Sequence, residues 1–212
     1  DYDRAQHHLF AQRVAEESAV LLKNDGGILP IRGREKTVAL IGAFAAEPRY
    51  QGAGSSRIVP TLMDTAVQAL PLCGMNVTGF AKGFEKNGRA NEKLAAEAVE
   101  LAKKADVAML YLGLDDPGEA EGEDRADMLL PENQLALLKA VAAVNKNVVV
   151  VLSCGCAVEM QWHRYANAVI HGYLGGQAGA MAMARLLTGQ ANPSGKLSET
   201  VPLNLAAVPS SP

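Results

Sequence analysis

Residues 147–152 read NVVVVL, the most strand-like run in the chain. Because a strand of β-branched side chains has no polar face, it must be covered on both faces of its sheet. Other strand-like segments lie at residues 37–44, 76–81, 107–112 and 168–173. Segments with a helical pattern separate them, at residues 62–70, 90–104, 131–144 and 178–188. This alternation predicts an α/β fold with a mainly parallel sheet and helices on both faces.

The two ends of the chain have patterns of their own. Residues 8–23 carry apolar side chains at a helical period, including Phe10 and Val14, and predict a leading helix. Residues 204–212 predict a loose tail. The chain of 212 residues is long enough for one large α/β domain with a full core. We therefore expect a single domain over residues 1–203.

The charge and hydropathy of the chain exclude several classes of partner. A net charge of −3 argues against nucleic acid and anionic membranes, since both call for a basic patch. No apolar run reaches the length of a membrane span. The first residues are polar, so we expect no signal peptide. These features predict a cytoplasmic protein, with a secreted or periplasmic bacterial protein as the alternative.

Cys73, Cys154 and Cys156 are the three cysteines of the chain. An odd number does not make a disulfide framework, and the spacing of cysteines and histidines does not fit a zinc site. We therefore expect buried, reduced thiols and no metal.

A run of acidic residues follows the predicted strand at 107–112. Residues 113–125 contain six carboxylates and end in Arg125; the six are Asp115, Asp116, Glu119, Glu121, Glu123 and Asp124. Loops at the carboxyl ends of strands are where α/β proteins place their chemistry. Cleavage of a glycosidic bond needs one carboxylic acid to protonate the leaving oxygen and a second carboxylate across the sugar. Crowding would raise the pKa of some of these acids, as a proton donor near neutral pH requires.

Two readings of this acidic run without catalysis stay open. It can be a solvated acidic loop, or it can bind calcium, although it lacks the alternating ligand spacing of an EF-hand. In either case, Arg125 can pair with a neighbouring carboxylate and hold the shape of the loop.

Residues 51–57 read QGAGSSR and contain Gly52, Gly54, Ser55 and Ser56. Backbone N–H groups of such a loop can hold a phosphate, which makes a nucleotide-binding module an alternative. The loop matches neither the dinucleotide fingerprint nor the P-loop pattern, however. We expect instead a tight turn that lets another chain segment or a sugar approach closely.

Several separated motifs together resemble the C-terminal α/β domain of glycoside hydrolase family 3, and they extend from about residue 8 to about residue 202. They share the family's order and spacing: AEESAVLLKN with LP at residues 15–30, VALIG at 38–42, GAGSS at 52–56, EAEGEDR at 119–125, LP with Gln134, NVVVVL at 147–152 and NPSGKL at 192–197.

This resemblance implies a six-stranded α/β sandwich that packs against an N-terminal (β/α)8 barrel, with residues 8–27 as the leading helix and link from the barrel. The barrel would carry a nucleophilic Asp. Matching E-G-x-D-R assigns the acid/base to Glu121, with Glu119 as the alternative. The chain would serve a retaining, exo-acting β-glycosidase of the β-glucosidase type that hydrolyses terminal, non-reducing β-linked sugars. The two catalytic carboxyls would then lie about 5–5.5 Å apart.

The resemblance also implies roles for other residues. No metal and no organic cofactor would take part. Further residues would bind substrate or shape the cleft between the domains: Gly52, Gly54, Ser55, Ser56, Arg57 and Arg125. The family's Trp-Tyr-Pro-Gly-Gln motif is replaced by GYLGGQ at residues 172–177, so we expect no aromatic contact to sugar from there.

We expect this chain alone to be inactive, because it has no barrel to supply the nucleophile. Its expected partners are a β-linked oligosaccharide or glycoside and the barrel, and we also allow for a homodimer. A non-catalytic carbohydrate-binding or structural α/β module is the alternative function.

Overall fold

The structure is a computed structural model that describes residues 3–55 and 57–209. One six-stranded sheet has the order β1-β6-β5-β4-β2-β3. Its strands are β1 (Val20–Asn24), β2 (Thr37–Ile41), β3 (Asn76–Ala81), β4 (Val107–Gly113), β5 (Val148–Ser153) and β6 (Ala168–His171). All neighbouring strands are parallel except β1 and β6, which are antiparallel. The prediction of a mainly parallel α/β sheet is therefore confirmed.

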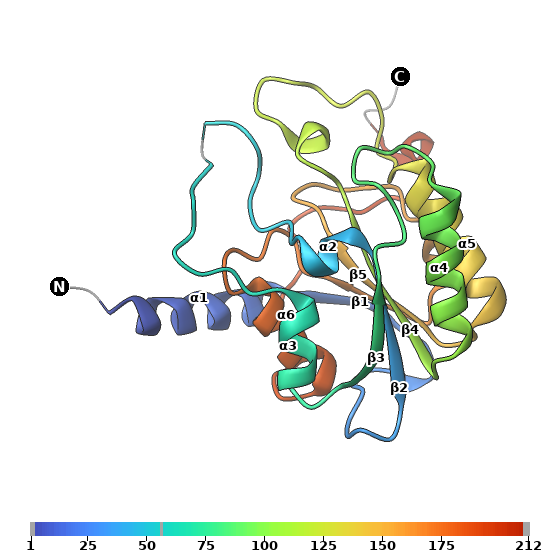
Figure 1. The fold of residues 1–212 in the computed structure, drawn as a ribbon. Coiled ribbons are helices and arrows are strands. Elements are labelled where there is room, and N and C mark those ends of the chain that lie inside the picture. The colour runs from blue at the N-terminus through green and yellow to red at the C-terminus, as the bar shows by residue number, and fades with distance from the viewer. Residues whose placement is uncertain (1–2, 56, 210–212) are drawn as a thin grey trace.

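Helices cover both faces of the sheet, as predicted (Figure 1). They are α1 (Arg4–Ser18), α2 (Ala43–Ala46), α3 (Ala66–Leu72), α4 (Glu92–Lys103), α5 (Glu132–Val144) and α6 (Gly179–Thr188). On one face, α4 packs beside α5; on the other, α6 lies between α3 and α1. Four short 3-10 turns complete the described elements, at Asp25–Gly27, Pro117–Glu119, Gln161–Tyr165 and Leu205–Ala207.

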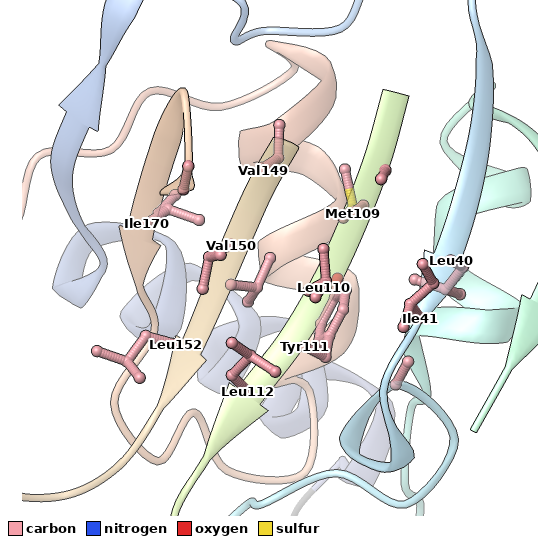
Figure 2. Close-up of a cluster of buried hydrophobic side chains, with 14 of the residues drawn as sticks. Leu40, Ile41, Met109, Leu110, Tyr111, Leu112, Val149, Val150, Leu152 and Ile170 are labelled. Atoms are coloured by element: carbon pink, nitrogen blue, oxygen red, sulfur yellow. The ribbon is translucent and has the colours of Figure 1, made fainter. Parts of the chain in front are cut away.

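The central strands carry the core. Every residue of β4 is buried, and β5 is buried up to Leu152. Figure 2 shows buried apolar side chains of β2, β4, β5 and β6 clustered along the sheet, including Ile41, Leu110 and Ile170. This burial on both faces is what the continuous apolar runs predict.

The prediction of one helix over residues 8–23 was wrong beyond Ser18. Residues from Val20 onward form the antiparallel edge strand β1. The sequence pattern predicted only the other five strands, and the sixth was implied by the family resemblance alone. The apolar side chains belong to two elements with different surroundings. Phe10 and Val14 of α1 are 67% and 50% exposed, whereas Val20 is buried against the core. Pairing with β6 outweighs the helical period here, because strand hydrogen bonds and burial come from the tertiary structure.

Smaller boundaries also differ from the sequence predictions. Helix α3 begins after Thr65, whose hydroxyl accepts a hydrogen bond from the Gln68 amide and so caps the helix. The tail is not loose throughout, since the Leu205 amide donates to Glu159 at 2.8 Å; residues 210–212 lie outside the described part. All three cysteines are free, and Cys154 is buried. Across the described ranges, no helix has the length and apolarity to cross a membrane.

Candidate active site

Two loops that the sequence analysis singled out lie side by side at the carboxyl-terminal edge of the sheet. Strands β2 and β4 are parallel neighbours, so the loop after α2 and the acidic loop after β4 rise from the same edge. Figure 1 shows them in cyan and yellow-green above that end of the sheet. Ala53 and Ala120 form a parallel bridge, and the Glu121 amide donates to the Ala53 carbonyl at 3.3 Å. The backbone itself therefore joins the two loops.

Glu121 is exposed on this pair of loops, and Ser55 holds its carboxylate. The Ser55 amide donates to Oε2 of Glu121 at 2.8 Å, and the Ser55 hydroxyl donates to the same oxygen. Gly54 has φ +109°, and a Cβ there would lie 2.5 Å from Cβ of Glu121. Glycine at this position thus permits both the backbone turn and the close approach of the acid.

The hydrogen bonds from the Ser55 hydroxyl and amide lower the pKa of Glu121 below its ordinary value. This differs from the expectation that crowded acids would raise it. The reason is that Glu121 has hydrogen-bond donors of its own, apart from those of two other acids in the loop. Glu121 bonds to Ser55, whereas Asp116 and Glu119 bond to Arg49.

Glu119 has a different environment, although it precedes Glu121 by two residues. Its side chain is 7% exposed and accepts a hydrogen bond from Nη2 of Arg49 at 2.9 Å. Its other oxygen accepts the Gly155 amide and lies 3.4 Å from Sγ of Cys156. Both oxygens of Glu119 are therefore engaged inside the protein.

The expectation that Arg125 pairs with a neighbouring carboxylate was wrong. Its Nη1 donates to Sγ of Cys156 at 2.8 Å and to the Ala157 carbonyl at 3.1 Å. Glu123 and Asp124, beside it in the sequence, are exposed. Arg125 turns inward instead and ties the acidic loop to the segment after β5, so it still holds the shape of the loop.

The remaining predicted cleft residues lie around a groove at this edge. Arg57 is exposed, and its guanidinium lies 3.5 Å from Asp116. The groove is lined in part by Arg49, Gly52, Arg57, Asp115 and Asp116. Ser56 lies outside the described residues. Within residues 3–55 and 57–209, no three His, Cys, Asp or Glu side chains gather in a way that could hold a metal ion.

Two residues of this site were not predicted from the sequence, Arg49 and Gly155. One signal could have found Arg49: it is a cation in the loop after the first core strand, opposite the six acids that follow a neighbouring strand. Gly155 had no such signal, because only its backbone amide takes part.

This geometry offers one exposed carboxyl that two donors orient, and the same two loops line a groove with charges of both signs. A carboxyl so placed can give and take a proton at a bound substrate. A phosphate in the 52–56 loop is disfavoured, because the Glu121 carboxylate already occupies the Ser55 amide.

Comparison with known proteins shows the family of the chain. A profile of the glycosyl hydrolase family 3 C-terminal domain matches residues 19–212. Thermostable beta-glucosidase B of Acetivibrio thermocellus is 45% identical over 212 residues, which cover 99% of this chain and 28% of that protein. An exo-alpha-(1->6)-L-arabinopyranosidase of Bifidobacterium longum is 42% identical over 99% of this chain and 29% of its own length.

A solved structure shows the same relationship. The crystal structure of a GH3 beta-glucosidase from Bifidobacterium adolescentis has a TM-score of 0.93 and 46% sequence identity, covering 99% of this chain and 31% of that one. The fold is thus that of the α/β domain of these relatives. The chain belongs to glycoside hydrolase family 3, as its C-terminal domain, and it spans less than a third of the length of these relatives.

Proposed function

We propose that this chain supplies the general acid/base, Glu121, to a retaining, exo-acting β-glycosidase whose active site is shared with an N-terminal (β/α)8 barrel. The substrate is a glycoside or oligosaccharide with a terminal, non-reducing β-linked sugar, of the β-glucosidase type. The contrast between two neighbouring acids carries this proposal: Glu121 is exposed, whereas Glu119 is enclosed and bonded to Arg49. Only an accessible carboxyl can reach a leaving-group oxygen.

The reaction has two steps. First, Glu121 donates its proton to the glycosidic oxygen while the barrel Asp attacks the anomeric carbon, so the leaving group departs as an alcohol. Then Glu121, now a carboxylate, takes a proton from water, which attacks the anomeric carbon and releases the sugar and the Asp. The second step returns both carboxyls to their starting states.

Covering the site prepares Glu121 for the first step. In this chain the hydrogen bonds from the Ser55 hydroxyl and amide stabilise the charged carboxylate and so lower its pKa. A barrel and a sugar placed over Glu121 would remove water from it, and desolvation disfavours the charged form. The pKa then rises toward the range in which a carboxylic acid keeps its proton.

The test compares Glu121→Gln and Glu119→Gln in the full-length enzyme that carries this chain. We expect Glu121→Gln to lower kcat/KM by about 10²–10⁴-fold on aryl β-glycosides with poor leaving groups, and much less on dinitrophenyl glycosides. Azide should then restore turnover of the dinitrophenyl substrate and yield a glycosyl azide. Glu123→Gln is the matched control, since Glu123 is an exposed acid of the same loop.

Two outcomes would count against the proposal. Azide rescue of Glu119→Gln in place of Glu121→Gln would assign the acid/base to Glu119. No dependence on the leaving group in either variant would favour a non-catalytic carbohydrate-binding or structural module. A homodimer and a cytoplasmic location stay predictions from the sequence.

A further inference from the structure

Arg49 joins the two loops of the candidate site through a buried side chain. It lies in the loop that leads to Ser55, and its side chain is 7% exposed. Nη1 donates to Asp116 and Nη2 donates to Glu119, so both contacts fall on the acidic loop. An arginine that donates to two carboxylates through separate nitrogens fixes the orientation of both carboxylates.

Glu119 extends this connection to a third segment. Its Oε1 accepts the amide of Gly155, which follows the end of β5. The loops after β2, β4 and β5 are therefore held together by one buried pair, Arg49 and Glu119. Glu121 follows Glu119 by two residues, and its partner Ser55 follows Arg49 on the other loop.

We propose that Arg49 and Glu119 form a positioning pair that sets where the Glu121 carboxyl lies above the sheet. This inference deepens the proposed function and rests on it. Both side chains are 7% exposed and bonded to one another, so we assign them a positioning role and no proton transfer of their own. The pair acts through the backbone that joins Glu119 to Glu121 and through the Ala53–Ala120 bridge.

The physical reason is that proton transfer is sensitive to the distance between the acid and the leaving oxygen. A general acid must lie within hydrogen-bond reach of the leaving oxygen, and a displacement of about 1 Å can cost about 100-fold in rate. Glu121 is exposed, and within the described part of the chain its carboxylate is hydrogen-bonded by Ser55, itself on a loop. Its place therefore depends on what holds the two loops to the sheet, and the pair is the buried, charged part of that support.

The test uses the full-length enzyme with Arg49→Lys and Glu119→Gln. Lysine keeps the positive charge of Arg49 but lacks the planar guanidinium that donates to two carboxylates at once. Glutamine keeps the shape of Glu119 but not its negative charge. Arg185→Lys is the matched control, because Arg185 also pairs with a glutamate, Glu16, outside the acidic loop. Intact sites are first counted from the burst of dinitrophenolate released by a 2-deoxy-2-fluoro glycoside, which scarcely needs the acid.

Per intact site, we expect both variants to lower kcat/KM about 10- to 100-fold on phenyl β-glycosides and less than about threefold on dinitrophenyl glycosides. Arg185→Lys should leave both substrates unchanged. A purely structural role would lower the number of intact sites but leave the dependence on the leaving group as it was. That result, or equal losses on both substrates, overturns the positioning role.

The same series separates this inference from the function beneath it. If Glu121→Gln shows the leaving-group dependence and Arg49→Lys does not, only the positioning role fails. If Glu121→Gln shows none, the proposed function fails as well. Azide distinguishes Glu119 from an acid/base, because a positioning variant keeps the Glu121 carboxylate and should gain nothing from azide.

Discussion

At the scale of single residues, the side chains of Glu119 and Glu121 show how one short motif serves two purposes. Both belong to the E-x-E-G-x-D-R motif, which the family resemblance proposes as the acid/base segment. The sequence could not separate their environments, because burial of Glu119 depends on Arg49 and Gly155 from other loops. The ion pair of Glu119 and the exposure of Glu121 are both set by the assembled edge of the sheet.

The hydroxyl of Ser55 can be tested directly as the cause of the lowered pKa. In Ser55→Ala, the pKa of Glu121 should rise toward its ordinary value, though not fully, because the amide of residue 55 still donates. A carboxyl whose folded pKa is lowered adds stability above its unfolded pKa, and this is lost as the pH falls through the folded pKa. Carbon-13 NMR titration of the Glu121 carboxyl measures the change. Ser18→Ala, whose hydroxyl bonds to Val14, is the control, and an unchanged pKa in Ser55→Ala would contradict the assignment.

The buried pair predicts a loss of stability that an exposed pair does not. Arg49→Met should lower the free energy of unfolding by about 3–5 kcal/mol, since it leaves Glu119 buried without its partner. Lys103→Met removes the exposed partner of Glu100 and should change stability by less than about 1 kcal/mol. Urea unfolding followed by circular dichroism measures both. Adding Glu119→Gln to Arg49→Met should recover part of the loss, and no recovery would argue against this cause.

At the scale of elements, local pattern predicted the central strands and the helices α4 and α5 well. Helix α4 at Glu92–Lys103 and strand β5 at Val148–Ser153 lie within two residues of their predicted bounds. These elements have strong periods or continuous apolar runs, so local preference and tertiary burial agree. Strand β1 was missed because its apolar residues continue a helical period, and only pairing with β6 makes it a strand.

The junction of β4 and α5 gives a prediction at this scale. Gln134 of α5 is fully buried; it accepts the Gly113 amide at 2.9 Å and donates to the Gly113 carbonyl at 2.8 Å. It thereby satisfies both backbone polar groups of Gly113, the last residue of β4 before the acidic loop begins. Gln134→Leu should lower the free energy of unfolding by about 2–4 kcal/mol, because it leaves two buried backbone groups unpaired.

Gln68→Leu is the control for this substitution. Gln68 is exposed on α3, so the change should stay within about 0.5 kcal/mol. Thermal or urea unfolding of both variants decides the matter, and equal effects would show that the bonds to Gly113 contribute little.

At the scale of the whole molecule, exposed apolar side chains lie on α1 and on the loop that carries Ser55. Phe10 and Val14 are 67% and 50% exposed on α1, and Ile58 and Val59 are 61% and 94% exposed on the loop. Contiguous exposed apolar surface commonly marks an interface. The proposed barrel would supply such a cover and, with it, the nucleophile.

The proposed division of the active site predicts that the chain of 212 residues alone does not hydrolyse aryl β-glycosides above the buffer rate. The reason is chemical: it can supply a proton but no nucleophile on the opposite side of the sugar. The same residues joined to a family barrel should be active. Release of nitrophenolate measures both, and turnover by the chain alone that Glu121→Gln abolishes would contradict the shared site.

The sequence by itself determined the α/β class, the central strands and the acidic motif, because these depend on local pattern and on residues close together in the chain. Tertiary structure alone decided that β1 is a strand, that Arg125 turns inward to Cys156 and that Glu119 is enclosed by Arg49. Each of these depends on partners far apart in sequence. Strand β1 needs its antiparallel neighbour β6, and the contacts of Arg125 and Glu119 form where parallel strands bring their carboxyl ends to one edge. The environment of a side chain is set by such neighbours, and a linear pattern does not contain them.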